Sequence, residues 1–130
     1  MDDIKKKRIL IVDDEPDLLS VMVAILRDGG FEVIPASSGS EAVTLAETEQ
    51  PDLILLDIKM PKMDGVMTTD LLRGKDATHH IPIAYLSNLV EEKQLVQDRV
   101  VGSRIGNMFF IPKTLPGEKI IELINQSFQN

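Results

Sequence analysis

The fold of this chain is decided by the stretch PDLILLDIKMPKMDG, residues 51–65. Its four consecutive aliphatic residues, 53–56, are typical of a strand buried on both faces, as in a parallel sheet covered by helices on each side. The run ends at an ionisable residue, Asp57, and a loop rich in Pro, Gly and Lys follows. In open α/β sheets the ligand crevice lies at the carboxyl ends of the strands. A carboxylate buried there is costly unless it has a partner, a cation or a task, so we take Asp57 as the centre of the function.

The same alternation of apolar runs and helical patterns extends along the whole chain. Strands are also predicted at residues 8–12, 31–35, 81–86 and 108–111. Helices are predicted to begin near Pro16 and Ser38, and to cover residues 64–73, about 91–101 and the last apolar stripe from Ile120 to Phe128. Residues 102–107 are expected to form a loop. Five alternations of strand and helix favour a single α/β domain over residues 1–130, a doubly wound five-stranded parallel sheet with helices on both faces.

Local signals predict how the helices begin and end. Asp14 or Glu15 is placed to cap the first helix, which Gly29-Gly30 should end. Ser38 and Glu41 match a capping box. In the third helix, Met67 and Leu71 lie on one face at helical spacing, and Met67 is expected to pack rather than to form a sulfur site.

The composition excludes several classes of function. The chain has 21 acidic and 14 basic residues and a formal net charge of −7, which argues against direct nucleic-acid binding through a basic face. It contains no Cys, and therefore no disulfide framework or thiolate metal site. It shows no signal peptide and no apolar run of membrane-spanning length. We expect a cytoplasmic domain without membrane contact.

Reactive groups follow four of the predicted strands. They are Asp13 and Asp14, Asp57, Ser87 and Lys113. The carboxyl ends of parallel strands lie along one edge of the sheet, so these side chains are expected to converge. Two like charges 4 Å apart repel by about 4 kcal/mol at an effective dielectric near 20, so three carboxylates require compensation. Mg²⁺, which prefers oxygen ligands and retains exchangeable waters, would supply it.

This chemistry suggests a role for each residue. Asp14 and Asp57 would bind the metal directly, and Asp13 would orient a bound water. The other carboxylate oxygen of Asp57 would then act as a nucleophile toward phosphorus. The Lys113 ammonium and the Ser87 hydroxyl would stabilise the oxygens of the transferring phosphoryl group. The backbone carbonyl of Lys59, two residues beyond Asp57, is a further expected metal ligand.

These motifs together resemble the receiver domain of two-component response regulators, of the chemotaxis type, over essentially the whole chain. The resemblance rests on the run ILIVDDE at residues 9–15, the stretch 51–65 already quoted, Ser87 and Lys113. It implies the flavodoxin-like strand order 2-1-3-4-5, which is borrowed from the family. It also implies that Asp57 accepts a phosphoryl group from a sensor histidine kinase or a histidine phosphotransfer protein, with Mg²⁺ required.

The resemblance further implies a two-state switch. Ser87 and Phe110 match the hydroxyl and aromatic positions that respond to phosphorylation in the family. The responding surface would comprise the fourth helix, the fifth strand and the fifth helix, between about Val90 and Phe128, and would bind a downstream protein. Phosphorylation-dependent dimerisation is left open. Such a domain catalyses its own phosphorylation but turns over no external substrate.

The chain departs from the family pattern at three places. Lys113-Thr114 stands where the family commonly has Lys-Pro with a cis bond, and a cis bond without Pro costs about 2.5–4 kcal/mol. We favour a cis bond here if the site is active. Asn88 replaces a small residue after Ser87, and residues 102–107 are longer than the usual connection.

Other interpretations stay open on the sequence alone. The departures at Asn88 and Thr114 are compatible with a pseudo-receiver, a binding module that phosphate does not control. A phosphatase of the aspartyl class would place a second Asp where Lys59 stands, and a flavin-binding fold lacks a phosphate-binding loop. Phe110 can simply pack, and His79-His80 lacks a third metal ligand. The sequence suits both a stand-alone protein and a segment of a longer regulator or hybrid kinase.

Overall fold

The computed structural model describes residues 6–58, 65–87, 104–105, 108–113 and 115–128. The elements in chain order are β1 (Arg8–Val12), α1 (Pro16–Asp28), β2 (Glu32–Ala36), α2 (Gly39–Glu49), β3 (Leu53–Asp57), α3 (Gly65–Arg73), β4 (Ile83–Ser87), β5 (Arg104–Ile105), β6 (Met108–Pro112) and α5 (Gly117–Phe128). The predicted helix over about 91–101 lies outside the described residues.

The strands form one sheet in the order β2-β1-β3-β4-β6-β5. The strands β2, β1, β3, β4 and β6 pair in parallel in that order. Since β6 is the predicted fifth strand, this confirms the predicted sheet and its order 2-1-3-4-5. The sixth strand, β5, corrects the prediction of a loop over residues 102–107, because it pairs antiparallel with β6 at the sheet edge. A strand of two residues has no hydrophobic period to reveal it. The signal that was missed is Gly106-Asn107, a dipeptide typical of a two-residue hairpin connection.

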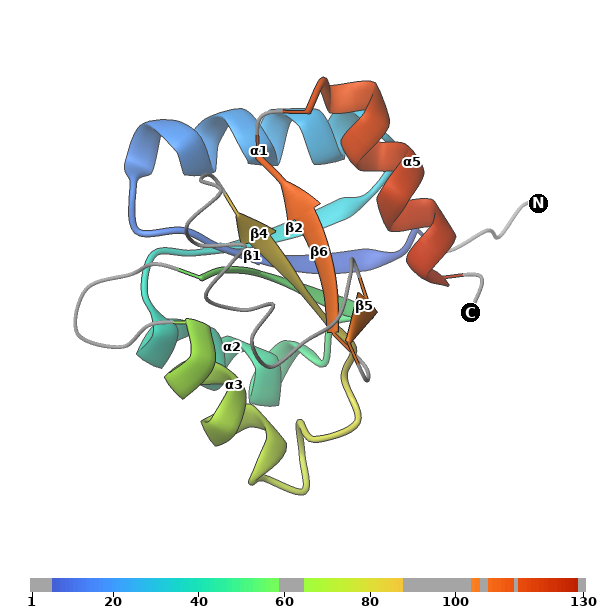
Figure 1. The fold of residues 1–130 in the computed structure, drawn as a ribbon. Helices are drawn as coiled ribbons and strands as arrows, with labels where there is room; N and C mark the ends of the chain where they lie inside the picture. Colours follow the sequence, from blue (N-terminus) through green and yellow to red (C-terminus); the bar gives the residue numbers. More distant parts are fainter. Residues whose placement is uncertain (1–5, 59–64, 88–103, 106–107, 114, 129–130) are drawn as a thin grey trace.

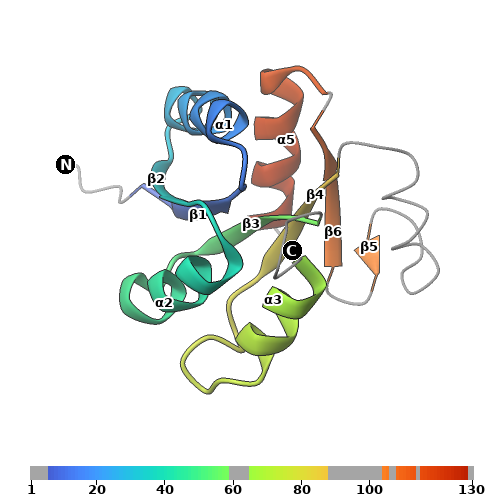
Figure 2. The ribbon, with the colours of Figure 1, turned by 90° about the vertical axis from the view of Figure 1, so that its left-hand side faces the viewer.

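The helices cover both faces of the sheet, as predicted. In Figures 1 and 2, α1 and α5 lie together on one side of the sheet, and α2 and α3 lie together on the other. Successive residues of β1 alternate between the two resulting cores: Leu10 and Val12 face the α2 and α3 side, and Ile9 and Ile11 face the α1 and α5 side. Both faces of the central strands are therefore apolar, which explains the aliphatic runs in the sequence.

The central strand β3 leads to the site and is enclosed on both faces. Leu53, Ile54, Leu55 and Leu56 are all buried, between β1 on one edge and β4 on the other. Burying one such side chain contributes about 1.5–3 kcal/mol, so this strand is a rigid support. Asp57 is its last residue and is itself buried.

The helix ends agree with the local signals except at the start of α1. Glu15 is the N-cap residue of α1, but its side chain makes no capping hydrogen bond. Gly30 adopts the positive φ of 94° that ends the helix, where a residue with a β-carbon would be strained. At α2, Ser38 Oγ accepts a hydrogen bond from the Glu41 amide at 3.1 Å, whereas the Glu41 carboxylate bonds the Ser37 amide rather than that of Ser38.

Helix α3 buries a different face from the one predicted. Met67 and Leu71 are 50% and 43% exposed, and the buried positions are Gly65, Thr68, Thr69 and Leu72. The expectation that Met67 is a packing residue is therefore wrong. Two threonines can lie inward because a helical Thr hydroxyl can bond the carbonyl one turn earlier, as Thr69 does with Gly65 at 2.7 Å. Among the described helices, none is both long and apolar enough to cross a membrane.

Candidate functional site

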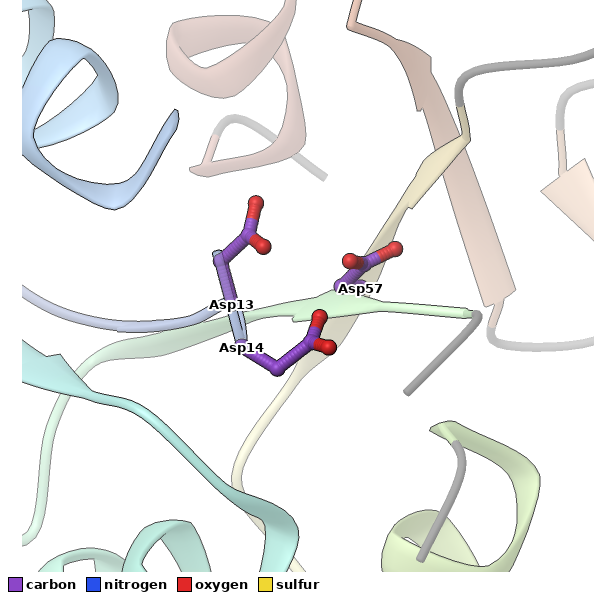
Figure 3. Close-up of side chains that lie close together, drawn as sticks. All are labelled: Asp13, Asp14 and Asp57. Atoms are coloured by element: carbon purple, nitrogen blue, oxygen red, sulfur yellow. The ribbon is translucent and has the colours of Figure 1, made fainter. Parts of the chain in front are cut away.

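Four of the five predicted strand-end groups follow β1, β3 and β6 and meet at one edge of the sheet. Asp13 and Asp14 come directly after β1, Asp57 ends β3, and Lys113 follows β6. One carboxylate oxygen from each of the three aspartates lies within 4.8 Å of the others. Figure 3 shows these three side chains gathered above the ends of the strands. The sheet thus brings residues 13 and 113 to the same place although 100 positions separate them.

Asp13 is completely buried and both of its carboxylate oxygens are engaged. Oδ1 accepts a hydrogen bond from the Glu15 amide at 3.0 Å, and Oδ2 accepts one from Lys113 Nζ at 3.1 Å. Its own amide donates to the Ala36 carbonyl at 3.1 Å, which anchors the residue to β2. Asp13 is therefore both the start of the turn into α1 and a fixed partner of Lys113.

Lys113 bridges two of the carboxylates. Its Nζ lies 3.0 Å from Asp57 Oδ2 as well as 3.1 Å from Asp13 Oδ2, and its side chain is 9% exposed. Burial by itself would lower the pKa of Lys113, because it penalises the charged form. The Coulombic attraction of Asp57, the hydrogen bonds to Asp57 and Asp13, and the attraction of Asp13 outweigh it, so the pKa of Lys113 is raised. The ammonium stays charged beside Asp57.

Asp14 differs from Asp13 in having no ion pair with another described residue. Within the described part of the chain, no hydrogen bond or ion pair engages its half-buried carboxylate. Figure 3 shows the Asp14 side chain turned toward Asp57, whereas the Asp13 carboxylate points away from Asp14. This orientation fits direct metal binding by Asp14 and Asp57 and an indirect role for Asp13.

The donor set fits a small hard cation. Among the described residues three carboxylates face one ammonium, which leaves two negative charges that a divalent ion would neutralise. All the side-chain donors are oxygens, the ligands that Mg²⁺ prefers, and Mg²⁺ is commonly bound by one or two carboxylates together with water. The residues present are thus suited to magnesium.

Several predicted residues cannot be placed with the same detail. Ser87 is the last residue of β4 and pairs with Pro112, and Phe110 lies in β6 opposite Tyr85, but their side chains are outside the described part. Lys59, Asn88 and Thr114 lie outside the described residues, and so does the Lys113–Thr114 peptide bond. The cis bond and the switch roles therefore stay predictions.

Gly65, the last residue of the quoted stretch 51–65, packs directly against the backbone of the site. A β-carbon on Gly65 would lie 2.7 Å from the Asp57 carbonyl oxygen and 3.0 Å from Ile58 Cα. Its amide donates to the Ile58 carbonyl at 2.9 Å, which fixes the first turn of α3 against the end of β3. The available signal was a glycine in the Pro/Lys-rich stretch directly after Asp57.

Gly65→Ala is expected to lower the free energy of unfolding by about 1–3 kcal/mol, because the new β-carbon meets backbone atoms that cannot rotate away. Gly74→Ala is the matched control at the other end of α3, where the added carbon would lie 3.4 Å from the Asp70 carbonyl oxygen, an ordinary contact. Its effect should stay within about 0.5 kcal/mol. Urea unfolding measures both variants, and equal losses would contradict the close approach at Gly65.

The raised pKa of Lys113 predicts a pH dependence of stability in metal-free solution. A folded pKa above the unfolded one means that the stabilisation is complete below the unfolded pKa, about 10.4, and is lost as the pH rises through the folded pKa. The test measures the free energy of unfolding of the wild type and of Lys113→Met by urea titration in the presence of EDTA, at pH values from about 7 to about 11. The difference between their free energies of unfolding should narrow in the alkaline range. A difference independent of pH would show that the ammonium is not held by the two carboxylates.

A buried aspartate beside a lysine, at the carboxyl edge of a doubly wound sheet, is the arrangement that the sequence predicts for a receiver domain. The family model for the response regulator receiver domain matches residues 9–125. The chain therefore belongs to the response regulator receiver domain family. Members of this family signal between histidine kinases and downstream targets, and typically bind Mg²⁺ at an aspartate cluster such as the one described here.

Individual relatives extend this assignment. The chain is 36% identical over 118 residues to protein PilH of Pseudomonas aeruginosa, an alignment that covers 91% of this chain and 94% of PilH. It is 41% identical over 100 residues to the alkaline phosphatase synthesis transcriptional regulatory protein PhoP of Bacillus subtilis, covering 77% of this chain and 39% of PhoP. The chain thus spans nearly all of PilH but about two fifths of the transcriptional regulator.

Solved structures show the same architecture. The chemotaxis response regulator CheY4 of Vibrio cholerae superposes with a TM-score of 0.79 at 25% identity, covering 95% of this chain and 99% of that one. The receiver domain of a signal transduction histidine kinase from Syntrophus aciditrophicus gives a TM-score of 0.78 at 28% identity, covering 95% and 90%. Receiver domains similar to this chain therefore occur both alone and within kinases.

Proposed function

We propose that this chain is a phosphoacceptor in a two-component phosphorelay, with Asp57 as the residue that accepts the phosphoryl group. One observation carries the proposal: Lys113 lies between Asp13 and Asp57, and the Asp14 carboxylate lies beside them, within 4.8 Å of both. This arrangement supplies a nucleophilic oxygen, a fixed ammonium and a place for a divalent cation. The donor would be a sensor histidine kinase or a histidine phosphotransfer protein.

The proposed reaction is a single displacement at phosphorus. A carboxylate oxygen of Asp57 forms the new P–O bond as the P–N bond of the phosphohistidine breaks, and the leaving imidazole nitrogen takes the electron pair. Lys113 would stabilise the negative charge on the phosphoryl oxygens, and Ser87 would donate a hydrogen bond to them. Asp14, Asp57, the Lys59 carbonyl and, through water, Asp13 would hold Mg²⁺, which would supply positive charge to neutralise the same oxygens.

The output would be a change of surface rather than turnover of a substrate. Ser87 and Phe110 would respond to the phosphoryl group, and the change would be read on the surface that includes β6 and α5 by a downstream protein. The similarity to PilH over nearly its full length supports this role. A cytoplasmic location, and one receiver domain over residues 1–130, belong to the same proposal, and the match over residues 9–125 supports the latter.

The proposal is tested by incubating the protein with acetyl phosphate and Mg²⁺ and measuring its intact mass. The expected result is the mass gain of one phosphoryl group, absent when EDTA replaces Mg²⁺. A wild-type protein that gains no mass would overturn the proposal and leave the chain as a binding module.

A further inference from the structure

Two buried hydroxyl groups join β4 to α3 next to the site. Tyr85 on β4 is 1% exposed and belongs to the apolar cluster between the sheet and the helices α2 and α3. Its hydroxyl is hydrogen-bonded to that of Thr69, which is 9% exposed. A hydroxyl buried among aliphatic side chains is costly without a hydrogen-bond partner, so each hydroxyl requires the other. Unlike the surrounding apolar packing, this hydrogen bond fixes the direction in which the two side chains point.

The direction of the hydrogen bonds follows from the number of protons. Thr69 Oγ1 donates to the Gly65 carbonyl oxygen at 2.7 Å. A threonine hydroxyl has one proton, so Thr69 can only accept from Tyr85. The Tyr85 hydroxyl therefore donates to Thr69, and Thr69 donates to Gly65. The side chain of β4 is thereby connected to the backbone of the first turn of α3.

This connection closes a circuit around the backbone of Asp57. The Gly65 amide donates to the Ile58 carbonyl at 2.9 Å, and the Ile58 amide donates to the Leu86 carbonyl at 3.3 Å. Leu86 is the neighbour of Tyr85 on β4 and the register partner of Asp57. Hydrogen bonds thus run from β4 to α3, from α3 to the end of β3, and from there back to β4.

We propose that Tyr85 and Thr69 are positioning residues for the phosphoacceptor: their paired hydroxyls fix the first turn of α3 and, through Gly65, the Asp57–Ile58 backbone. The hydrogen bonds given above connect both side chains to the Asp57 backbone through Gly65. The inference rests on the proposed function, because what is positioned is the carboxylate that binds Mg²⁺ and accepts the phosphoryl group. It predicts that two hydroxyls inside the core set the metal affinity of the site.

The test compares three single variants, each of which lacks one buried hydroxyl group. Thr69→Val and Tyr85→Phe interrupt the circuit. Thr78→Val is the matched control: Thr78 is completely buried, and its hydroxyl donates to the Leu72 carbonyl at 2.7 Å near the other end of α3, away from Asp57. Each protein is titrated with Mg²⁺ by isothermal calorimetry, unfolded in urea, and phosphorylated with acetyl phosphate.

Thr69→Val is expected to weaken Mg²⁺ binding by about tenfold, the usual effect of losing a group that orients a metal ligand. Tyr85→Phe should also weaken Mg²⁺ binding. The double variant should bind Mg²⁺ with the same affinity as Thr69→Val, because the two residues act in series. The NMR signals of the Ile58 and Gly65 amides should shift in both variants. Thr78→Val should lose stability while its Mg²⁺ affinity stays within about twofold of wild type.

The outcomes separate this inference from the proposed function. If the wild type binds Mg²⁺ and is phosphorylated but Thr69→Val binds Mg²⁺ no more weakly than Thr78→Val, the positioning role is overturned alone. If the wild type binds no Mg²⁺, the proposed function falls and the inference falls with it. Tyr85→Phe removes a single oxygen and keeps the ring, so it supplies the answer even if Thr69→Val does not fold.

Discussion

Asp57→Asn is expected to abolish phosphorylation by acetyl phosphate. The amide has nearly the same shape as the carboxylate, but its oxygen is a poor nucleophile toward phosphorus and carries no charge to hold Mg²⁺. Intact mass after incubation with acetyl phosphate and Mg²⁺ should show the gain of one phosphoryl group in the wild type and none in the variant. This is the largest effect we expect from any single substitution in the chain.

Asp52→Asn is the control for this experiment. Asp52 lies just before β3, at the opposite end of the strand from Asp57, and its carboxylate accepts a hydrogen bond from the Arg8 amide at 2.8 Å. The Asp52→Asn variant should gain one phosphoryl group as the wild type does, because the side chain at position 52 cannot reach the cluster at the carboxyl edge. A phosphoryl group retained in Asp57→Asn would place the acceptor elsewhere and refute the assignment of Asp57.

Lys113→Met should slow phosphorylation at saturating Mg²⁺ by about 10²–10³-fold, the usual cost of removing one donor to a transition-state oxyanion. The Met side chain fills a similar space but leaves Asp13 and Asp57 without the ammonium between them. Breaking a buried pair by removing one partner costs about 3–5 kcal/mol, so the metal-free variant should also be markedly less stable. Added Mg²⁺ should restore part of this loss, because binding to the folded state alone stabilises it.

Lys75→Met is the matched control. Its Nζ lies 3.5 Å from Glu47 Oε1, with side chains 42% and 39% exposed, and such a surface pair contributes about 0–1 kcal/mol. Phosphorylation rate should be unchanged in this variant. If Lys113→Met were phosphorylated at the wild-type rate, the ammonium would have a structural role only, and the proposed stabilisation of the phosphoryl group would be wrong.

The site illustrates which contacts a sequence can indicate. Strand-end residues were predicted to converge because the carboxyl ends of parallel strands share one edge, and Asp13, Asp14, Asp57 and Lys113 do meet there. The sequence predicts direct metal binding by Asp14 and an indirect role for Asp13, but a pair of adjacent aspartates does not by itself show which one is buried. The structure separates them, since Asp13 is buried and paired with Lys113 whereas Asp14 turns toward Asp57.

The face that α3 buries shows the opposite case. Its apolar residues Met67 and Leu71 suggested one face, but the helix buries Thr68 and Thr69 instead. A hydrophobicity pattern counts threonine as a polar residue and therefore predicts that it faces the solvent. Inside the core the Thr69 hydroxyl has two partners, the Gly65 carbonyl one turn earlier and the Tyr85 hydroxyl, sixteen residues away on β4.

The sequence by itself determined the strands, the faces of the sheet and the residue types at its carboxyl edge, because burial imposes a period that aliphatic runs reveal. The tertiary structure alone decided which of those residues touch: Lys113 between Asp13 and Asp57, Gly65 against the Asp57 backbone, Tyr85 with Thr69, and the short strand β5. The contacts of Lys113 join segments about 55 and 100 residues apart, because Asp57 ends β3 and Asp13 follows β1. They depend on the order and crossing of elements, which no local period encodes.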